Sequence, residues 1–251
     1  MEQIAEHPVP KGPLAVRWLA LDQPRVEAGA LTRVRVELEN AGSAAWPASR
    51  SVEGIKLSYH WLDARGNPIV WDGLRRAFEQ SVEPGERRTI DLELRGPIPP
   101  GAYRLALDLV EEGRFWFAQV GGTALVTEVH VAPRDASSAR AWLPEDGEPA
   151  PDRDERIRAA HEEGYAAVGG SIEAIVGRLG RVPREFAAWA PGGGRNPAFG
   201  QPLLCPSLLV PLEPNEELFG LPAWRPEGGE PWLYDGRIRL RARLPIDRPR
   251  G

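Results

Sequence analysis

The sequence has very little cysteine and methionine and no long apolar segment. It contains one cysteine, Cys205, and one methionine among 251 residues. A single cysteine cannot build an internal disulfide framework, which indicates a reducing compartment and predicts a cytoplasmic protein. No run approaches the roughly 18 apolar residues that span a bilayer, and residues 1–13 lack the apolar core of a secretory signal. We therefore expect no membrane span.

Histidine and excess positive charge are scarce as well. Four histidines are present, and 36 acidic residues outnumber 31 basic ones, so the net charge is -5. An acidic chain is a poor general binder of nucleic acid. The few histidines and the single cysteine show no metal-ligand spacing, and neither a phosphate-binding loop nor a nucleophile elbow occurs. The sequence predicts no nucleic-acid partner, no metal and no cofactor.

Glycine and proline, in contrast, are abundant. Together the 27 glycines and 26 prolines make up about a fifth of the chain, compared with about 12% in average proteins. Many of them separate short runs in which apolar and polar residues alternate, as in 34–39 and 55–61. Pro84-Gly85 and Pro100-Gly101 have the composition of type II turns. This pattern indicates short antiparallel strands and argues against a helical bundle.

The alternating runs predict the fold class of the front half. Successive strand side chains point to opposite faces, so each run buries one face and exposes the other. Tyr103, which follows Pro100-Gly101, resembles the tyrosine corner of immunoglobulin-like sandwiches. We predict a mainly β protein, with an immunoglobulin-like antiparallel β-sandwich over 14–132 and a smaller irregular α+β segment behind it. Its strands are expected over 14–20, 31–39, 54–62, 68–72, 87–95, 102–110, 114–119 and 124–131.

The second half of the chain has a different composition. Residues 133–152 are polar, acidic and proline-bearing, which is typical of a linker. From Asp154 to Val168 apolar residues recur at three- and four-residue steps, which predicts a helix. We expect a second short helix over 171–179 and a strand over 237–244. Residues 153–251 are otherwise predicted to be irregular and to pack on something larger.

A group of aromatic and charged residues is the candidate binding site. Trp71 lies at a strand end beside Asp72 and Arg75. In the run 115–117, alternation exposes Trp116 if the flanking phenylalanines are in the core. Exposed aromatic rings beside carboxylates and arginine suit a sugar, since the ring accepts its C–H face and the charged groups bind its hydroxyls. We predict that a ligand contacts Trp71, Asp72, Arg75, Glu112 and Trp116; the alternative is that these aromatics cover a sheet edge or contact the second half.

Several motifs of the front half are similar to those of a known class of module. They are Asn40-x-Gly42-x-x-x-Trp46, Tyr59-His60-Trp61-Leu62-Asp63-x-x-Gly66, Pro84-Gly85-Glu86, Pro100-Gly101-x-Tyr103 and Asp108-Leu109-Val110-Glu111-Glu112-Gly113-x-x-Trp116. The chain resembles a bacterial immunoglobulin-like module that accompanies glycosyltransferases and methyltransferases of surface-polysaccharide pathways. More loosely, it resembles the C-terminal carbohydrate-binding domain of O-antigen ABC transporters. The resemblance covers 14–132 and implies binding of a polysaccharide in the cytoplasm.

Three functions remain open at this point. The first is a non-catalytic carbohydrate-binding or accessory module in bacterial cell-surface polysaccharide biosynthesis. The second is an interaction module that recruits a glycosyltransferase or methyltransferase without binding sugar. The third is a fragment of a nucleotide-sugar-dependent glycosyltransferase with its site around Asp152, Asp154, His161 and Arg195. No residue set in the sequence has a recognisable catalytic arrangement, which favours the first two.

Overall fold

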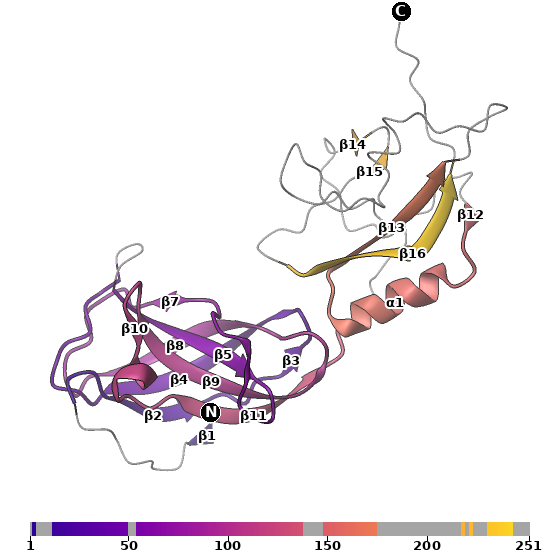
Figure 1. Cartoon of the computed structure of the whole chain (residues 1–251). Coiled ribbons are helices and arrows are strands. Elements are labelled where there is room, and N and C mark those ends of the chain that lie inside the picture. The colour runs from indigo at the N-terminus through magenta and orange to yellow at the C-terminus, as the bar shows by residue number, and fades with distance from the viewer. Residues whose placement is uncertain are drawn as a thin grey trace, which may run out of the picture. The chain divides into compact units, whose positions relative to one another are not determined.

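The fold was analysed in a computed structural model of the 251-residue chain (Figure 1). The structure describes residues 2–3, 12–49, 54–137, 148–174, 217–218, 221–222 and 230–242. Contacts divide the chain into two compact units, Met1–Ala132 and Pro133–Gly251, and each unit is described by itself. Among the residues described, no helix is long and apolar enough to cross a membrane.

The first layer of unit 1 is a four-stranded antiparallel sheet. Its strand order is β1-β2-β4-β8, with β1 over Glu2–Gln3, β2 over Val16–Leu21, β4 over Leu31–Asn40 and β8 over Arg87–Arg95. The register between β4 and β8 is continuous and places Arg33 opposite Glu93 and Arg35 opposite Asp91. These pairs form ion pairs on the solvent side of the sheet, while Val34 and Val36 point into the core.

The second layer is a seven-stranded sheet, with the order β3-β11-β9-β5-β6. Strand β10 pairs with β9, and β7 pairs with β5 on the same side as β6. All pairings are antiparallel except β3 with β11. The bounds are β3 Val26–Glu27, β5 Ile55–Leu62, β6 Pro68–Val70, β7 Arg76–Ala77, β9 Gly101–Glu111, β10 Phe115–Trp116 and β11 Leu125–Ala132.

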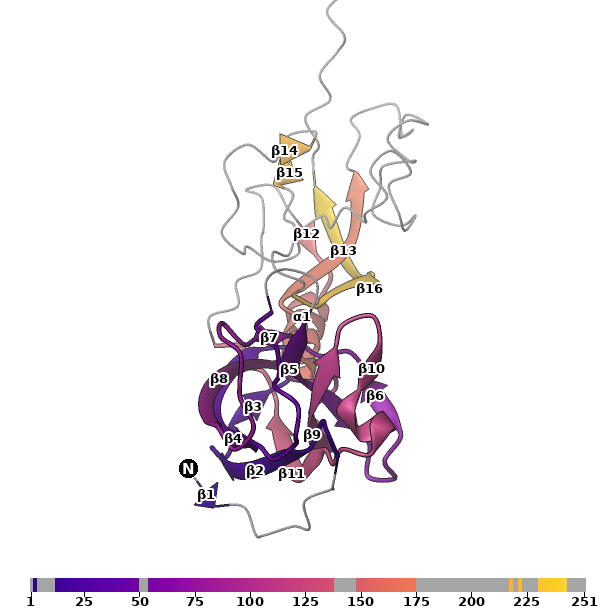
Figure 2. The ribbon, with the colours of Figure 1, turned by 90° about the vertical axis from the view of Figure 1, so that its left-hand side faces the viewer.

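One hydrophobic core lies between the two sheets. Its members come from β2, β4 and β8 on one side and from β5, β9 and β11 on the other, and they include Leu38, Leu92, Leu57, Leu107 and Val129. Figure 2 shows unit 1 from a second direction, with β8 and β4 at one flank and β10 and β6 at the other. Burial of alternate residues from both layers stabilises the sandwich. The mainly β prediction is confirmed.

The type II turn predicted at Pro84-Gly85 is confirmed in its geometry, whereas the one predicted at Pro100-Gly101 is not, because Gly101 has a φ of 157° and begins β9. Gly85 has a φ of 80°, as the third position of a type II turn requires. The Tyr103 hydroxyl donates a 2.7 Å hydrogen bond to the carbonyl of Pro99. This bond ties the start of β9 to the preceding loop, which is what a tyrosine corner does.

Two strands of unit 1 end earlier than predicted. The strand expected over 68–72 is β6, which ends at Val70. The sequence predicts a strand over 114–119, but β10 covers only Phe115–Trp116 and a 3-10 helix, η1 (Phe117–Val120), follows. The side chain of Gln119 accepts a hydrogen bond from the backbone of Trp116, and the Asp108 carboxylate accepts one from the backbone of Ala118. These side-chain acceptors favour the helical turn over continued strand pairing.

In its described residues, unit 2 has helix α1, a small mixed sheet and a separate antiparallel pair formed by β14 and β15. Helix α1 precedes β13, which runs parallel to β16, and β12 pairs antiparallel with the other side of β16. Ile157 and Ala160 of the helix pack with Val168 and Ile238 of the two long strands. The bounds are β12 Glu148–Pro149, α1 Arg153–Glu163, β13 Ala167–Ala174, β14 Glu217–Leu218, β15 Leu221–Pro222 and β16 Trp232–Ala242.

Three predictions for the second half were wrong in part. The first helix ends at Glu163 and not at Val168, because Gly164 adopts a positive φ of 123° at the C-cap. Residues 171–174, predicted as the start of a second helix, belong to β13, since pairing with β16 overrides local propensity. The last strand begins at Trp232, five residues before the predicted start. Residues 175–179 and 243–244 lie outside the described part of the chain.

Candidate functional site

The candidate site is built on an interruption in the strand that borders β5. Strands β6 and β7 both pair with β5, and residues 71–75 between them leave the sheet edge. Gly73 keeps this segment close to β5, because its N–H donates a 3.0 Å hydrogen bond to the Tyr59 carbonyl. A Cβ at this position would lie 2.6 Å from that oxygen. Glycine is therefore the residue that lets 71–75 cover the outer face of β5.

Arg75 holds this covering segment in place. Its Nε donates to the Glu112 carboxylate at 2.8 Å, and one terminal nitrogen donates to Asp72 at 2.8 Å. The other terminal nitrogen donates to the Ser58 hydroxyl at 2.8 Å and to the Gly73 carbonyl at 2.7 Å. Four of the five guanidinium N–H groups are thus engaged within the protein. Arg75 therefore positions the site and has little capacity left for a ligand.

Three aromatic rings lie on the same face of β5. The Trp71 indole stacks on the His60 imidazole, with the ring centroids 4.1 Å apart and the planes 21° from parallel. Trp116 meets His60 edge-on at 4.2 Å and Trp71 edge-on at 6.0 Å. The Arg75 guanidinium lies 4.8 Å from the centroid of the Trp116 ring, within the range of a cation–π interaction. We call Trp71, His60, Trp116, Arg75, Asp72 and Glu112 the aromatic–ionic cluster.

The five residues predicted from the sequence thus come together, but one of them was assigned the wrong exposure. Trp116 is only 7% exposed, whereas Trp71 is 45% exposed. Alternation does place Trp116 on the outer face, opposite Val110 of β9. That face is not open at this point, because Trp71, His60 and Arg75 cover the ring. The solvent-exposed indole of the site is Trp71 alone.

Sequence reasoning missed the polar residues beneath the cluster. Lys56, Ser58 and His60 point to the outer face of β5, and Asp108 lies opposite Ser58 on β9; all four are buried. Lys56 Nζ lies 3.6 Å from the Glu112 carboxylate. The alternation of β5 assigned these side chains to solvent. The sequence did contain a signal that this face is covered. The short segment 71–75 has a tryptophan, a glycine and an arginine, which is unusual for a fully solvent-exposed loop.

Burial changes the proton affinity of two groups at this face. Desolvation raises the pKa of Asp108 to about 6, although the N–H groups of Ala118 and Leu109 donate to its carboxylate and act in the opposite direction. Desolvation lowers the pKa of His60, and its contact with the Trp71 carbonyl counteracts this only in part. Because a carbonyl only accepts, His60 Nδ1 carries the proton in that contact. His60 is therefore a neutral, fixed support for the Trp71 ring near neutral pH.

The surface that a ligand meets consists of Trp71 and its charged neighbours. The Asp72 side chain is 70% exposed, and those of Arg75 and Glu112 are 25% and 21% exposed. An indole face packs against apolar C–H groups, and an exposed carboxylate accepts hydrogen bonds from hydroxyl groups. Among the described residues, no group of three or more histidine, cysteine, aspartate and glutamate side chains is arranged to hold a metal ion.

The alternative enzyme residues in unit 2 do not form a site in the described part of the chain. Asp152 pairs with Arg156 at 2.6 Å, and Asp154 pairs with Arg153 at 2.8 Å. His161 is buried two helical turns further along α1, about 10 Å from Asp154 along the axis. Arg195 lies outside the described residues. Local ion pairing at the start of α1 accounts for both aspartates.

Comparison with known proteins finds similarity at the level of structure only. No protein-family model matches the chain, and no curated protein matches it. A crystal structure of the C-terminal domain of wzt aligns with 49% of this chain and 76% of its own length, at 11% identity and a TM-score of 0.33.

Two glycosidases are among the other similar structures. A β-glucosidase from Listeria innocua, solved in complex with gluconolactone, aligns over 46% of this chain and 15% of its own length, at 16% identity and a TM-score of 0.27. A putative β-galactosidase from Bacteroides fragilis aligns over 65% and 20%, at 15% identity and a TM-score of 0.26. The chain spans a small part of both enzymes, and likenesses this weak carry no conclusion about its activity or ligand.

Proposed function

We propose that unit 1 is a non-catalytic carbohydrate-binding module of bacterial cell-surface polysaccharide biosynthesis, and that its glycan binds at the aromatic–ionic cluster. The observation that carries the proposal is the Trp71 indole, 45% exposed and stacked on His60. An exposed indole offers a flat apolar surface, with a polar N–H at one edge, against which the C–H face of a sugar ring can pack.

His60 holds the Trp71 ring in a fixed orientation, which suits it to a polysaccharide, a ligand whose repeated units each bind weakly. His60 covers one face of the indole, so the exposed area belongs to the other face and the ring edge. A ring held in one orientation loses little conformational entropy on binding. The C–H face of a sugar would pack on this surface, while neighbouring hydroxyl groups donate to Asp72.

The charges of the cluster suggest an uncharged sugar. Arg75 is engaged by Glu112, Asp72, Ser58 and Gly73, so it is not free to bind a ligand carboxylate. The most exposed polar group beside Trp71 is the Asp72 carboxylate, which attracts hydroxyl donors and repels anions. We therefore expect neutral hexose units to bind in preference to uronic acids.

The test is a titration of the full chain with neutral and acidic bacterial surface oligosaccharides, followed by tryptophan fluorescence and calorimetry. Trp71→Ala should weaken binding of the neutral glycan about tenfold, the loss expected for one stacked aromatic contact. The matched control is Leu31→Ala, because Leu31 is 50% exposed on β4 of the other sheet. Its affinity should equal that of the unmodified protein.

Unchanged affinity of Trp71→Ala would contradict the assignment of the site, and no response to any surface glycan would contradict the function. In the second case, co-purification with a glycosyltransferase or methyltransferase from the same pathway would favour the recruiting module. Turnover of a nucleotide sugar by the purified chain would favour the enzyme.

A further inference from the structure

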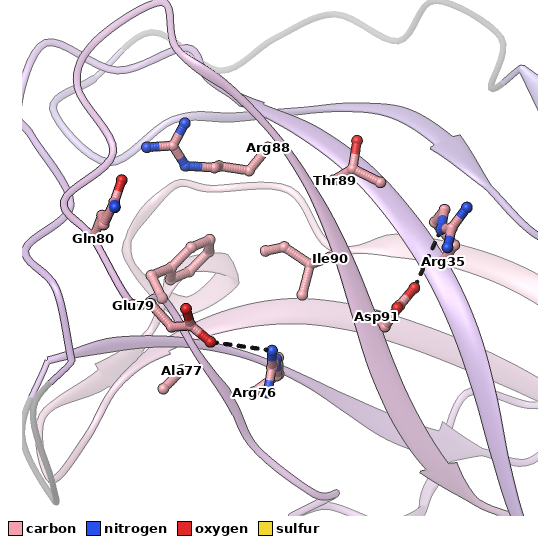
Figure 3. Close-up of a pocket in the computed structure, with 10 residues that line it drawn as sticks. Arg35, Arg76, Ala77, Glu79, Gln80, Arg88, Thr89, Ile90 and Asp91 are labelled. Atoms are coloured by element: carbon pink, nitrogen blue, oxygen red, sulfur yellow. Dashed lines mark hydrogen bonds and ion pairs between the residues drawn. The ribbon is translucent and has the colours of Figure 1, made fainter.

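A second surface feature of unit 1 lies where the edges of the two sheets meet. Strand β8 is the last strand of the four-stranded sheet, and it contacts β7 at the border of the other sheet. Between them is an open cavity of about 470 Å³ (Figure 3). Its lining comes from three parts of the chain: Arg35 of β4, residues 76–80 and residues 88–91. None of these residues belongs to the aromatic–ionic cluster.

Two large apolar side chains take part in the lining of the cavity. Phe78 and Ile90 are 3% and 9% exposed and belong to the core between the sheets. Figure 3 shows Ile90 in the middle of the lining residues. The cavity thus reaches the lateral border of the core, and its volume lies within the range of small-molecule sites.

The rim carries three arginines from three different strands. Arg76 of β7 lies opposite Leu57, a core residue of β5, and therefore on the inner face of the sheet. Arg35 of β4 and Arg88 of β8 flank the cavity on the side of the four-stranded sheet. Arg88 is held by Glu86 and by the Ser81 carbonyl. Arg35 and Arg76 are less constrained.

The ion pairs of Arg35 and Arg76 are weak and easily exchanged. Arg35 contacts Asp91 through Nε alone, at 3.2 Å, and the two side chains are 55% and 45% exposed. Arg76 lies 3.6 Å from Glu79, and these side chains are 50% and 84% exposed. Exposed pairs of this kind contribute little free energy. A guanidinium that uses one nitrogen still offers a two-pronged donor surface to a carboxylate or phosphate.

We propose that this cavity binds a small amphipathic anion, whose carboxylate or phosphate group is held by Arg35 and Arg76 and whose apolar ring packs on Phe78 and Ile90. Glu79 turns into solvent when the anion binds Arg76, since its side chain is already largely exposed. Asp91 stays on Nε of Arg35, which leaves the terminal nitrogens of Arg35 for the ligand. The inference rests on the cavity and is independent of the glycan site.

The experiment is a titration of the isotope-labelled full chain, followed by amide chemical shifts. The probes are benzoate, phenyl phosphate, acetate and benzyl alcohol, which separate the charge from the ring. We expect the two aromatic anions to shift the amides of 76–80 and 88–91 and to bind more tightly than acetate or benzyl alcohol. The tighter of the two aromatic anions identifies the anionic group.

Arg35→Gln and Arg76→Gln should each weaken binding of the tighter probe about tenfold, the loss of one charge-assisted contact. Arg33→Gln is the matched control, because Arg33 lies two residues from Arg35 on the same face, pairs with Glu93 of β8 and does not line the cavity. Its affinity should be unchanged. Any of three results would overturn the proposal. Arg35→Gln and Arg76→Gln could bind the probe as tightly as Arg33→Gln does, the probes could cause no shifts along the cavity, or acetate could bind as tightly as benzoate. In that case the inward position of Arg76 serves only to protect the sheet edge from pairing.

Discussion

In both sheets of unit 1, polar residues of the outer face alternate with core residues, but these polar residues are exposed on one sheet and buried on the other. On β4, Arg33 and Arg35 alternate with core valines and form ion pairs with β8 in water. On β5, Lys56, Ser58 and His60 alternate with core residues in the same way, but all three are buried. The difference is the covering segment 71–75, which adds a second layer of contacts to β5. Alternation therefore assigns a side chain to one face of the sheet. Contacts with other segments determine whether that face is exposed to solvent.

The largest effect on stability is expected when the largest buried ring of the covered face is removed, and it tests the difference between the two outer faces. Trp116→Ala should lower the free energy of unfolding by about 4 kcal/mol, because the ring is 7% exposed and contacts His60, Trp71 and Arg75. Trp71→Ala, at the exposed end of the same cluster, should cost less than about 1 kcal/mol. Urea unfolding measures both. Equal losses would show that the covered face is not a packed layer.

The second effect concerns the buried carboxylate of the covered face. Burial raises the pKa of Asp108 from 3.8 to about 6, so the unfolded chain releases this proton at lower pH than the folded chain does. The contribution of Asp108 to stability is therefore greatest in acid and falls as the pH rises through the interval between these values. That displacement of the pKa corresponds to about 3 kcal/mol.

The measurement compares unfolding of the unmodified protein with that of Asp108→Asn as a function of pH. The stability of the unmodified protein relative to the variant should fall by about 3 kcal/mol between about pH 4 and about pH 7. The lowered pKa of His60 acts in the other direction, since its stabilising effect is lost as the pH falls, but it is present in both proteins and cancels. A difference that does not vary with pH would contradict the burial of a titrating carboxyl group.

The third effect separates the shape of Arg75 from its charge. Arg75→Met should destabilise the protein by about 2 kcal/mol, because Glu112 loses its closest partner and Ser58 loses a donor. Arg75→Lys should recover only part of this loss, since a lysine cannot reach Glu112, Asp72 and Ser58 at once. Full recovery by lysine would mean that charge alone matters at this position.

The smallest effect is expected on the solvated face. A double-mutant cycle with Arg33→Gln and Glu93→Gln should give a coupling free energy of about 0.5 kcal/mol, since the two side chains are 68% and 53% exposed. High salt should reduce this coupling further. A coupling as large as the effect of Arg75→Met would remove the contrast between the two faces.

The regular strands of unit 1 follow from local sequence to within about two residues. The strand predicted over 87–95 is β8, and that predicted over 102–110 is β9 with one more residue at each end. These segments alternate strictly and end at glycine- or proline-containing turns. The two-residue strands β3 and β7 could not be found in this way, because their pairing partners are distant in sequence and they contain no period of their own.

Five of the six members of the aromatic–ionic cluster were predictable, but His60 and the layering of the cluster were not. Trp71, Asp72, Arg75, Glu112 and Trp116 do lie together, since a strand end and a neighbouring turn place them there. The burial of Trp116 beneath an exposed Trp71 was not predictable. It depends on Gly73, which lets 71–75 approach the backbone of Tyr59 and bring Trp71 over His60. In unit 2, pairing of 171–174 with β16 likewise replaced a locally plausible helix.

The sequence by itself determined that this protein is mainly β, where most of the long strands of unit 1 lie, and which side chains of each strand point to the core. These properties are local, because they depend on the two-residue period and on the backbone angles that glycine and proline allow. Only the tertiary structure decided which outer face is covered, which tryptophan meets solvent, and that a cavity opens between β7 and β8. Those properties depend on contacts between segments far apart in the chain, and such contacts leave no periodic trace in either segment alone.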